Sequence, residues 1–409
     1  MVSVAVIGLG FVGKELAKHF YNHGYCVVGV DTDKNALERL RIELQPQINQ
    51  STWNGGILSL QSDYSGLEKV PNILVCLPTD VTEDGAPDLT ILLDGLKSLA
   101  PHIAAGQLIS IESTVYPGAT KGVIQKFLID QSGHKDFFLV CSPERVDPTN
   151  TQYDIGDIPK LVGGVDKGST MVARRFYGHT FQVVEVTANE AELAKLVENS
   201  FRLVNIGLAN EWAQLAKKLR VNIWTVINAA STKPFGFMPF YPGPGVGGNC
   251  IPVNPKYLTW SGRKHHSPQH TIKHYDAVNE NQPQYIVNRL AEHFDGELKG
   301  KTVLLVGMAY KANTSDTRNS PSVDVAKLLI ERGAFIFYHD PLVPAINISG
   351  GRWQSDSLTE ERFDYINAVV LLTAHTDIDY AMIVGCADYI FDTRNILGGF
   401  GSLPNIEIL

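Results

Sequence analysis

The chain has 409 residues, of which 44% are hydrophobic and 19% charged, as expected for a globular protein of two or three domains. A formal net charge of −8 argues against a nucleic-acid-binding protein, which needs a basic surface. Five cysteines at scattered spacings show neither a disulfide framework nor a zinc pattern, so we expect no metal site and a reducing compartment. Because no membrane span or signal peptide is evident, we expect a cytoplasmic protein.

Short apolar runs alternate with helical patterns in the first third of the chain. This alternation predicts a doubly wound parallel sheet, which is an α/β fold. The predicted strands lie at residues 2–7, 26–30, 73–76, 108–111 and 138–140.

The first strand leads directly into Gly8-Leu9-Gly10-Phe11-Val12-Gly13. Glycines at this spacing permit a tight turn, a close approach of a pyrophosphate and helix–strand contact. Asp31 ends the second strand, where its carboxylate can bind a ribose 2′-hydroxyl and would repel a 2′-phosphate. The pattern therefore predicts an NAD site, and the alternative is a glycine turn without a ligand.

Polar residues follow three further strands, at the edge where ligands bind in such sheets. Thr79 and Thr114 have this position, although ordinary capping of the next helix would also explain them. Glu144 and Arg145 follow the next strand and are candidates for a general base and an anion clamp. A surface ion pair explains this last pair equally well.

Residues 189–229 have a helical pattern that is apolar on more than one face, which predicts burial between domains or against a second subunit. Lys195 and Asn199 are four residues apart and share one face of this helix. The lysine is a candidate for stabilising an oxyanion, and a solvent-facing pair is the alternative.

A loop rich in glycine and proline then runs from Gly243 to Pro255. Five of its first six residues are glycine or proline, so its backbone is open to a phosphate or sugar. Cys250 has turn residues on both sides, which favours a reactive thiol over a buried structural cysteine. A second helical stretch follows, at about residues 268–293.

A strand pattern restarts at residues 302–307 and recurs at 334–338 and 368–372, which predicts a second α/β domain. Lys311 and Asp316-Thr317-Arg318 follow its first strand, and phosphate binding, capping or surface pairing would explain them. We therefore expect two Rossmann-like doubly wound parallel-sheet domains joined by a central helical domain. The predicted boundaries are residues 1–188, 189–295 and 296–409.

Taken together, these motifs resemble the UDP-glucose/GDP-mannose dehydrogenase family over nearly the whole chain. The matching segments are Gly8–Gly13, Glu112–Val115, Ser142–Arg145, Ala194–Asn199, Gly247–Pro252 and Lys311…Asp316-Thr317-Arg318. Residues 231–244 look most like the UDP-N-acetylglucosamine 6-dehydrogenase branch, with UDP-glucose and UDP-N-acetylmannosamine as competing substrates.

The resemblance implies oxidation of a sugar C6 alcohol to a carboxylate with two NAD and one water, by a homodimer formed through the central helix. Cys250 would form a thiohemiacetal and then a thioester, Lys195 and Asn199 would stabilise the oxyanion, and Glu144 would be the base for hydrolysis. NAD would contact Gly8, Gly10, Phe11, Val12, Gly13, Asp31, Thr79, Thr114 and Arg318. The UDP-sugar would contact Glu144, Arg145, Val146, Lys195, Asn199, Arg202, Tyr241, Gly247, Lys311 and Arg394. Thr114 would also place the catalytic water.

One residue departs from the family pattern Cys-x-Pro-x-Asp-Pro, because position 254 is asparagine. The resemblance implies that the family's aspartate at this position helps to order the catalytic water and the lysine. Asn254 keeps the size and an acceptor oxygen but loses the charge. Three interpretations stay open: a tolerated variant, a slowed enzyme, or a changed reaction, and a protein that binds NAD and UDP-sugar without useful chemistry is the rival from another class.

Overall fold

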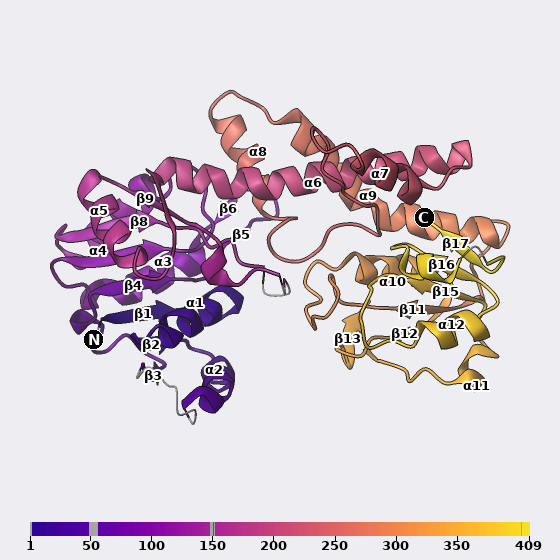
Figure 1. Cartoon of the computed structure of the whole chain (residues 1–409), viewed down its shortest axis with the longest axis horizontal. Helices are drawn as coiled ribbons and strands as arrows, with labels where there is room; N and C mark the ends of the chain where they lie inside the picture. Colours follow the sequence, from indigo (N-terminus) through magenta and orange to yellow (C-terminus); the bar gives the residue numbers. More distant parts are fainter. Residues whose placement is uncertain (1, 49–55, 148–149, 151, 402) are drawn as a thin grey trace. The chain divides into compact units, whose positions relative to one another are not determined.

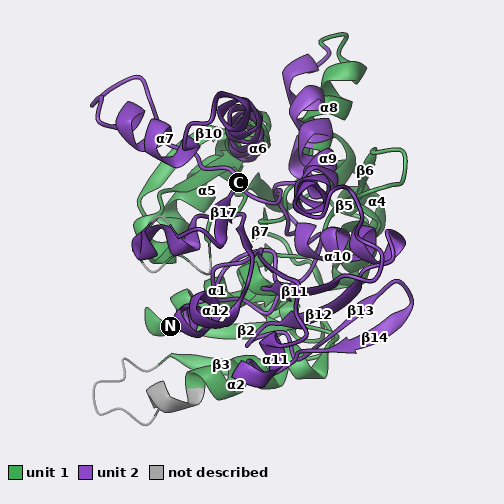
Figure 2. Cartoon of the chain, turned by 90° about the vertical axis from the view of Figure 1, so that its right-hand side faces the viewer, with its two compact units in different colours: residues 1–198, 256–267 green, residues 199–255, 268–409 purple. Residues whose placement is uncertain are grey.

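The computed structural model describes residues 2–48, 56–147, 150, 152–401 and 403–409. Figure 1 shows the helices and strands along the chain, and Figure 2 shows the two compact units into which they cluster. Unit 1 contains residues 1–198 and 256–267, and unit 2 contains residues 199–255 and 268–409. Among the described residues, no helix combines the length and the apolar character needed to cross a membrane.

Unit 1 is built on an eight-stranded sheet with the strand order β3-β2-β1-β4-β7-β8-β9-β10. Neighbouring strands are parallel except for β8 and β9, which are antiparallel. The strands are β1 (Ser3–Ile7), β2 (Cys26–Val30), β3 (Ile57–Gln61), β4 (Asn72–Val75), β7 (Gln107–Ile111), β8 (Phe137–Cys141), β9 (Lys160–Gly164) and β10 (Val183–Thr187). A small antiparallel ladder joins β5 (Asp80–Val81) and β6 (Pro87–Asp88).

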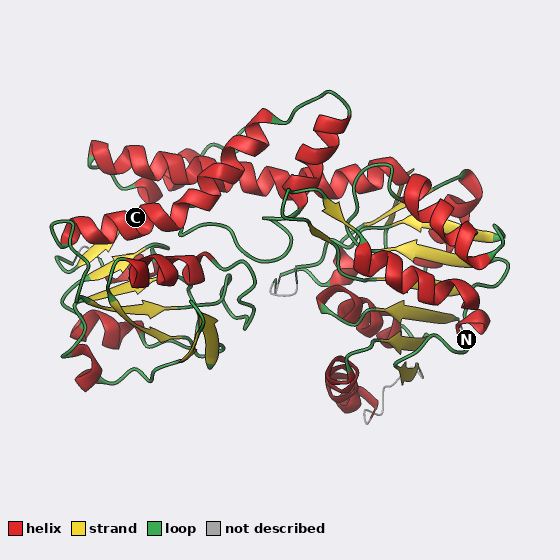
Figure 3. Cartoon of the chain, turned by 180° about the vertical axis from the view of Figure 1, so that it is seen from behind, coloured by secondary structure: helices red, strands yellow, loops and turns green. Residues whose placement is uncertain are grey.

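Helices cover both faces of this sheet, as Figure 3 shows. One buried cluster includes Leu96 and Leu128, and the cluster on the other face includes Leu16 and Phe176. The predicted doubly wound architecture is therefore confirmed for the N-terminal part. Its helices are α1 (Phe11–Asn22), α2 (Lys34–Ile48), α3 (Thr90–Leu99), α4 (Gln125–Ser132), α5 (Lys167–Tyr177) and α8 (Asn254–Lys264), which begins within unit 2. Shorter turns are the 3₁₀ segments Leu67–Lys69, Ala100–His102 and Ile155–Asp157 and the π-helical turn Thr120–Ile124.

Unit 2 contains a second, fully parallel sheet with the order β12-β11-β15-β16-β17. Its strands are β11 (Thr302–Val306), β12 (Phe335–His339), β15 (Ala368–Leu371), β16 (Ile390–Asp392) and β17 (Ile406–Ile408). The helices that belong to this domain are α10 (Pro321–Glu331), α11 (Glu360–Phe363), α12 (Tyr380–Cys386) and the 3₁₀ segment Ile396–Phe400. A separate hairpin joins β13 (Ala345–Ile348) and β14 (Gly351–Gln354).

The central helical part consists of α6 (Ala188–Leu219), α7 (Ile223–Ser231) and α9 (His270–His293). Its first helix ends earlier than the sequence pattern predicts, so the expectation of one helix through residue 229 is wrong. Arg220 has φ +56°, a left-handed backbone that a helix cannot continue through. Asn222 then starts α7, because its side chain accepts hydrogen bonds from the backbone N–H groups of Trp224 and Thr225.

The two large sheets have the same close contact where their first strand ends. Gly8, after β1, has φ +85°, and a Cβ there would lie 2.8 Å from the carbonyl oxygen of Cys76. Gly307, after β11, has φ +89°, and a Cβ there would lie 2.5 Å from the Cβ of Thr373. Glycine is therefore required at both positions by conformation and by space.

An aspartate after the second strand then holds each of these glycine loops. Asp31 accepts the backbone N–H of Leu9 at 2.6 Å, and Asp340 accepts that of Met308 at 2.7 Å. Asp340 is only 2% exposed, accepts three more backbone N–H groups and lies 3.2 Å from Nε2 of His375. Burial alone would raise the pKa of Asp340, but the His375 ring and the N–H donors outweigh burial and lower that pKa.

We expect Asp340→Asn to lower the free energy of unfolding of the C-terminal α/β domain by about 2 kcal/mol near neutral pH. Both oxygens of Asp340 accept backbone N–H groups, and the asparagine would replace one of these oxygens with an NH₂ group, which cannot accept them. Since the folded pKa of Asp340 lies below its unfolded value, the charged form stabilises the fold above about pH 4, and this contribution disappears as pH falls through the folded pKa.

Urea unfolding near pH 7 and again near pH 3 measures this difference between wild type and variant. Asp324→Asn, which breaks an exposed pair with Lys327, is the control and should cost less than about 0.5 kcal/mol. The same loss for Asp340→Asn at both pH values would contradict the assignment.

Candidate active site

The helix α1 begins at the glycine-rich turn, and the three glycines of that turn have different surroundings. A Cβ on Gly13 would overlap the carbonyl oxygen of Gly8, so the turn and the helix are packed together there. A Cβ on Gly10 would meet nothing within 4 Å. Gly10 therefore leaves open space directly at the positive end of a twelve-residue helix. This cradle fits the pyrophosphate of NAD.

Asp31 is held in place for a ribose by its own backbone contacts. Its Oδ2 accepts the N–H of Leu9, and its Oδ1 accepts the N–H of Asp33 at 2.8 Å. The side chain stays partly exposed, in contrast to the buried Asp340. Because a carboxylate has about four acceptor positions, lone pairs remain for ribose hydroxyls. The residues present thus fit NAD.

The structure brings two predicted strand-end threonines together. The Oγ1 of Thr79 donates a hydrogen bond to the carbonyl oxygen of Thr114 at 2.7 Å, and both residues are partly buried. Thr79 thus joins the ends of two strands rather than capping a helix. Of the residues at the start of α1, Phe11 is 50% exposed and Val12 is partly buried.

Glu144 belongs to a buried group of charges that sequence reasoning did not find. The ammonium of Lys160 lies 2.6 Å from Oε2 of Glu144 and 2.5 Å from Oε2 of Glu112. All three side chains are at most 3% exposed. The hypothesis that Glu144 forms a surface pair is therefore wrong, because it is buried and its cation is a lysine sixteen residues away in sequence.

The backbone also fixes the orientation of Glu144. Its Oε1 accepts the N–H of Arg145 at 2.6 Å and of Val146 at 2.9 Å. Burial raises the pKa of Glu144, but Lys160 and these two N–H groups outweigh burial and bring the pKa below its usual value. Glu144 is therefore a carboxylate at neutral pH, which is the form that a general base requires.

Arg145 has partners of its own. Its guanidinium lies 2.7 Å from Oε1 of Glu198 and donates to the carbonyl oxygen of Pro159. The side chain is 20% exposed, so it lies at the surface of unit 1. An anion clamp at this residue would have to compete with Glu198.

Lys195 and Asn199 are both buried on α6, at 9% and 7% exposure. The alternative that this pair faces solvent is therefore wrong. The Lys195 ammonium makes no hydrogen bond or ion pair to the residues that the structure describes, and Nδ2 of Asn199 finds no acceptor there. The Nδ2 of Asn199 is buried, and a buried donor without an acceptor is costly unless it binds something, which is typical of a ligand site. Arg202, further along the helix, is exposed.

In unit 2, three buried amide side chains bind the backbone of the loop that precedes Cys250. Asn210 of α6 accepts the N–H of Gly243 at 2.9 Å, and Gln282 of α9 donates to the carbonyl oxygen of that glycine at 2.9 Å. Asn279 accepts from the N–H of Val246 at 2.5 Å and donates to its carbonyl oxygen at 3.2 Å. Because glycines have no side chain to anchor the loop, these amides hold it through its backbone.

The glycines of this loop approach the protein's own strand-end loops in unit 2. A Cβ on Gly247 would lie 2.6 Å from the carbonyl oxygen of Asn319, and one on Gly248 would lie 2.8 Å from the ring of Tyr310. The N–H of Gly248 also donates to the carbonyl oxygen of Arg318 at 2.9 Å. From the sequence we expect the open backbone of this loop to leave room for a ligand. At these two glycines, however, the close neighbour is the protein itself.

The loop thus delivers Cys250 as an exposed thiol at the carboxyl edge of the C-terminal sheet. Gly243, earlier in the loop, packs against the guanidinium of Arg394. A Cβ on Gly243 would lie 2.7 Å from that guanidinium. Burial lowers the pKa of Arg394 to about 10, although Asp392 opposes this shift. Lys311 and Arg318 lie in the loop after β11, where Arg318 pairs with Asp316 at 2.6 Å. Unit 2 therefore gathers the thiol loop and three predicted cations at one edge.

Two further predicted residues have defined local surroundings. Asn254 begins α8, its N–H donates to the carbonyl oxygen of Cys250 at 2.9 Å, and it is 4% exposed. Its Nδ2 has no acceptor among the described residues. Tyr241 stacks on Trp224 with ring centroids 5.0 Å apart and donates to Oδ1 of Asn228 at 2.7 Å.

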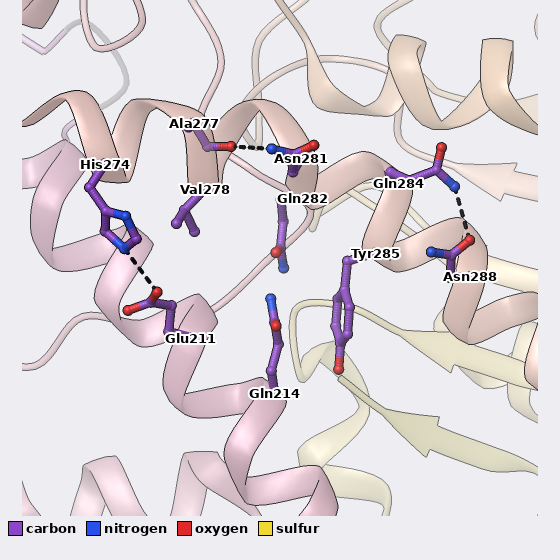
Figure 4. Close-up of a pocket in the computed structure, with 10 residues that line it drawn as sticks. All are labelled: Glu211, Gln214, His274, Ala277, Val278, Asn281, Gln282, Gln284, Tyr285 and Asn288. Carbon is purple, nitrogen blue, oxygen red and sulfur yellow. Dashed lines mark hydrogen bonds and ion pairs between the residues drawn. The ribbon is translucent and has the colours of Figure 1, made fainter.

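A cavity of about 460 Å³ between α6 and α9 lies apart from the predicted residues, since none of them lines it. Figure 4 shows Gln214 and Gln282 pointing toward one another across this cavity, and His274 reaching Glu211 at 3.1 Å. Most of the predicted site residues therefore gather at the carboxyl edges of the two sheets and along α6, and not in this cavity.

The buried partners Lys160, Asn210, Asn279 and Gln282 were missed for a common reason. None of them belongs to a functional motif, and the three amides lie inside helix patterns. Lys160 starts β9, and functional residues are normally sought where strands end. The antiparallel direction of β9 brings its first residue to the edge where β7 and β8 end.

The fold and the cradle at α1 define a protein with one dinucleotide-binding domain and a second nucleotide-type domain. The comparisons agree: residues 2–181 match the NAD binding domain, 189–281 the central domain and 304–399 the UDP binding domain of the UDP-glucose/GDP-mannose dehydrogenase family.

Individual relatives match over most of their length. A UDP-N-acetyl-D-mannosamine dehydrogenase of Methanococcus maripaludis is 30% identical over 96% of this chain and 93% of its own. The UDP-N-acetyl-D-glucosamine 6-dehydrogenase of Pseudomonas aeruginosa is 33% identical over 84% of each chain. The structure of a UDP-glucose dehydrogenase from Pyrobaculum islandicum matches with a TM-score of 0.87 at 27% identity, over 100% of this chain and 96% of that chain.

The chain therefore belongs to the UDP-glucose/GDP-mannose dehydrogenase family, and it is an NAD-dependent UDP-sugar dehydrogenase. The expected fold, family and cofactor are confirmed.

We expect Gly10→Ala and Gly13→Ala to fail in different ways. The methyl group of Gly10→Ala enters open space, so the protein should fold normally but bind NAD at least about tenfold more weakly, because the pyrophosphate needs that space. Gly13→Ala forces a methyl group into the Gly8 carbonyl and should lower stability by about 1–3 kcal/mol.

Calorimetric titration with NAD and thermal unfolding separate the two effects. Gly122→Ala, whose added Cβ also meets nothing within 4 Å, is the control and should change neither quantity. Wild-type NAD affinity in Gly10→Ala would show that the pyrophosphate does not approach here.

Proposed function

We propose that this protein oxidises a UDP-sugar at C6 by four electrons to the uronic acid, through a covalent bond to Cys250. The observation that carries the proposal is the exposed Cys250 thiol on a loop that amides and strand-end loops hold at the edge of the UDP-binding domain. A thiol that formed only core contacts would be buried among apolar side chains.

The chemistry assigns each side chain a separate task. Oxidation of the C6 alcohol releases a proton and a hydride and gives an aldehyde, and NAD, when bound, accepts the hydride of each oxidation. The Cys250 thiolate adds to the aldehyde carbon, and the oxygen becomes a thiohemiacetal alkoxide that Lys195 and Asn199 stabilise. Loss of the second hydride leaves a thioester. Water placed by Thr114 and deprotonated by Glu144 then releases the carboxylate and the free thiol.

For the substrate we propose a UDP-N-acetylhexosamine, with UDP-N-acetylglucosamine favoured by the resemblance of residues 231–244. UDP-N-acetylmannosamine is the main competitor, since several relatives carry that substrate in their names. UDP-glucose is the third candidate, because a solved relative is named for it. The phosphates would bind near Lys311 and Arg394, whose loops lie at the edge of the C-terminal sheet.

We also propose a homodimer formed through α6. This helix carries large apolar side chains that are 40–62% exposed, at spacings of four residues. They are Leu193, Val197 and Phe201 in its first half and Leu215 and Leu219 at its end. Exposed apolar side chains aligned along one helix are typical of a protein–protein interface.

We expect two NADH per UDP-sugar consumed, and a uronic acid as the product. Cys250→Ala should abolish turnover while NAD and the UDP-sugar still bind, because the thiol is needed for the covalent step and not for the nucleotide sites. NADH absorbance and mass spectrometry over UDP-N-acetylglucosamine, UDP-N-acetylmannosamine and UDP-glucose provide the measurement. Cys386→Ala, at a partly buried thiol of the C-terminal domain, is the control and should keep full activity.

One NADH per sugar would overturn the four-electron reaction. Binding of NAD and UDP-sugar with no NADH over several hours would instead favour the rival function, a binding protein without catalysis.

We expect Asn254→Asp to change kcat by less than about threefold and to leave the product unchanged. Asn254 begins a helix, where a carboxylate is tolerated, and its amide already has the size and acceptor oxygen of aspartate. Steady-state kinetics with product masses test this. A gain of tenfold or more would show that the missing charge limits the rate, and an aldehyde product from wild type would show that the reaction stops after one oxidation.

A further inference from the structure

Lys160 lies where two carboxylates and a strand reversal meet inside unit 1. Its Nζ is within 2.6 Å of both Glu112 and Glu144, and its side chain is 3% exposed. β9 runs antiparallel to β8, pairing Val140 with Gly164 and Cys141 with Gly163. Continued by three residues, this register sets Lys160 opposite Glu144, just beyond the end of β8.

The group contains two carboxyl groups and one ammonium; burial and the nearby Glu144 raise the pKa of Glu112, although Lys160 opposes this shift. Glu112 is also bound by the hydroxyls of Tyr177 and of Ser110, the latter at 2.8 Å. Glu144 is bound by two backbone N–H groups. If the ammonium were removed, two carboxylates would be left close together in a buried place, and such a pair holds a shared proton well above the usual carboxyl pKa.

The other titratable groups that face Lys160 are neutral at working pH. Burial raises the pKa values of Tyr177 of α5, of Cys141 of β8 and of Cys76, which follows β4. Burial lowers the pKa of His19 of α1 to about 4, so this ring is uncharged above that pH. Lys160 is thus the single positive charge that the described part of unit 1 offers to the two carboxylates.

We propose that Lys160 is a positioning residue for the sugar oxidation: it keeps Glu144 ionised and fixes the direction of its carboxylate for hydrolysis of the thioester. This role rests on the proposed function, in which Glu144 is the base. Lys160 does not touch the substrate; it acts through Glu144. A purely structural lysine would support folding but would leave the pH dependence of the reaction unchanged.

The first test is the pH profile of kcat in Lys160→Met, which keeps most of the side-chain volume and removes the charge. Protonated Glu144 is inactive, so the acid limb of kcat should move upward by about one pH unit or more, into the neutral range. KM for the UDP-sugar should change by less than about threefold.

Lys160→Arg should return the acid limb to within about half a pH unit of wild type, because a guanidinium can also bridge two carboxylates. Lys135→Met, at an exposed lysine of unit 1, is the control and should leave the profile as it is. An acid limb in Lys160→Met that coincides with that of wild type would overturn the proposal.

A second test needs no turnover, so it separates this proposal from the proposed function. Infrared spectra of protein labelled with ¹³C-glutamate report protonated carboxyl groups directly. Lys160→Met should show an additional carboxylic-acid band near about pH 7, beyond any that wild type and Lys160→Arg show. If wild type makes no NADH but this band appears, the charge role of Lys160 stands and the proposed reaction fails; if NADH forms and the band is absent, the role of Lys160 fails alone.

Should Lys160→Met not fold, the double variant Lys160→Met/Glu112→Gln removes one charge of each sign and leaves Glu144 as the only buried carboxylate of the group. The acid limb of this double variant should lie above that of wild type. It should lie below the limb expected for Lys160→Met, in which two carboxylates are left without the ammonium. A limb at the wild-type position would again overturn the proposal.

Discussion

The contact of backbone with backbone at the end of the first strand is the constraint on which each nucleotide-type domain depends. In both sheets a glycine with positive φ lies against a residue just beyond a neighbouring strand, Gly8 against Cys76 after β4 and Gly307 against Thr373 after β15. This contact turns the chain sharply and directs the following loop across the carboxyl edge. The two domains then diverge at the aspartate that holds the loop. Asp31 stays partly exposed and fits a ribose, whereas Asp340 is enclosed by four N–H donors and His375 and serves the fold.

The fold could be predicted to a large extent because parallel strands buried on both faces must be apolar and β-branched throughout. The strands at Cys26–Val30 and Thr302–Val306 begin and end within a residue of the sequence pattern. The pattern failed where conformation is decided by one residue. Arg220 interrupts the long helix with a left-handed turn, and nothing in the composition of that segment marks an arginine for this role. The direction of β9 was equally hidden, because parallel and antiparallel strands have similar sequences when both faces are covered.

The candidate site could be predicted where a residue type combines with a turn signal. Cys250 among glycines and prolines, and Glu144 after a strand, met this condition, and Lys195 was found by its spacing from Asn199. The amides that hold the loop of Cys250 could not be predicted in this way. Asn210, Asn279 and Gln282 are buried polar residues inside ordinary helix patterns, without a turn signal. Their function is visible only in the structure, where each binds a loop backbone that lacks side chains of its own.

The two kinds of support differ in a way that suits the residues they hold. Glu144 is held by an ammonium, which fixes its charge as well as its direction. The loop of Cys250 is held by neutral amides, which fix a backbone through donor and acceptor together but bring no charge. In the reaction proposed above, the thiol would pass through thiolate, thiohemiacetal and thioester, and a rigid loop would keep it in place through all three. The amide at Asn254, bonded through its own backbone to Cys250, is consistent with that arrangement, because it adds another neutral group where the family pattern has a negative one.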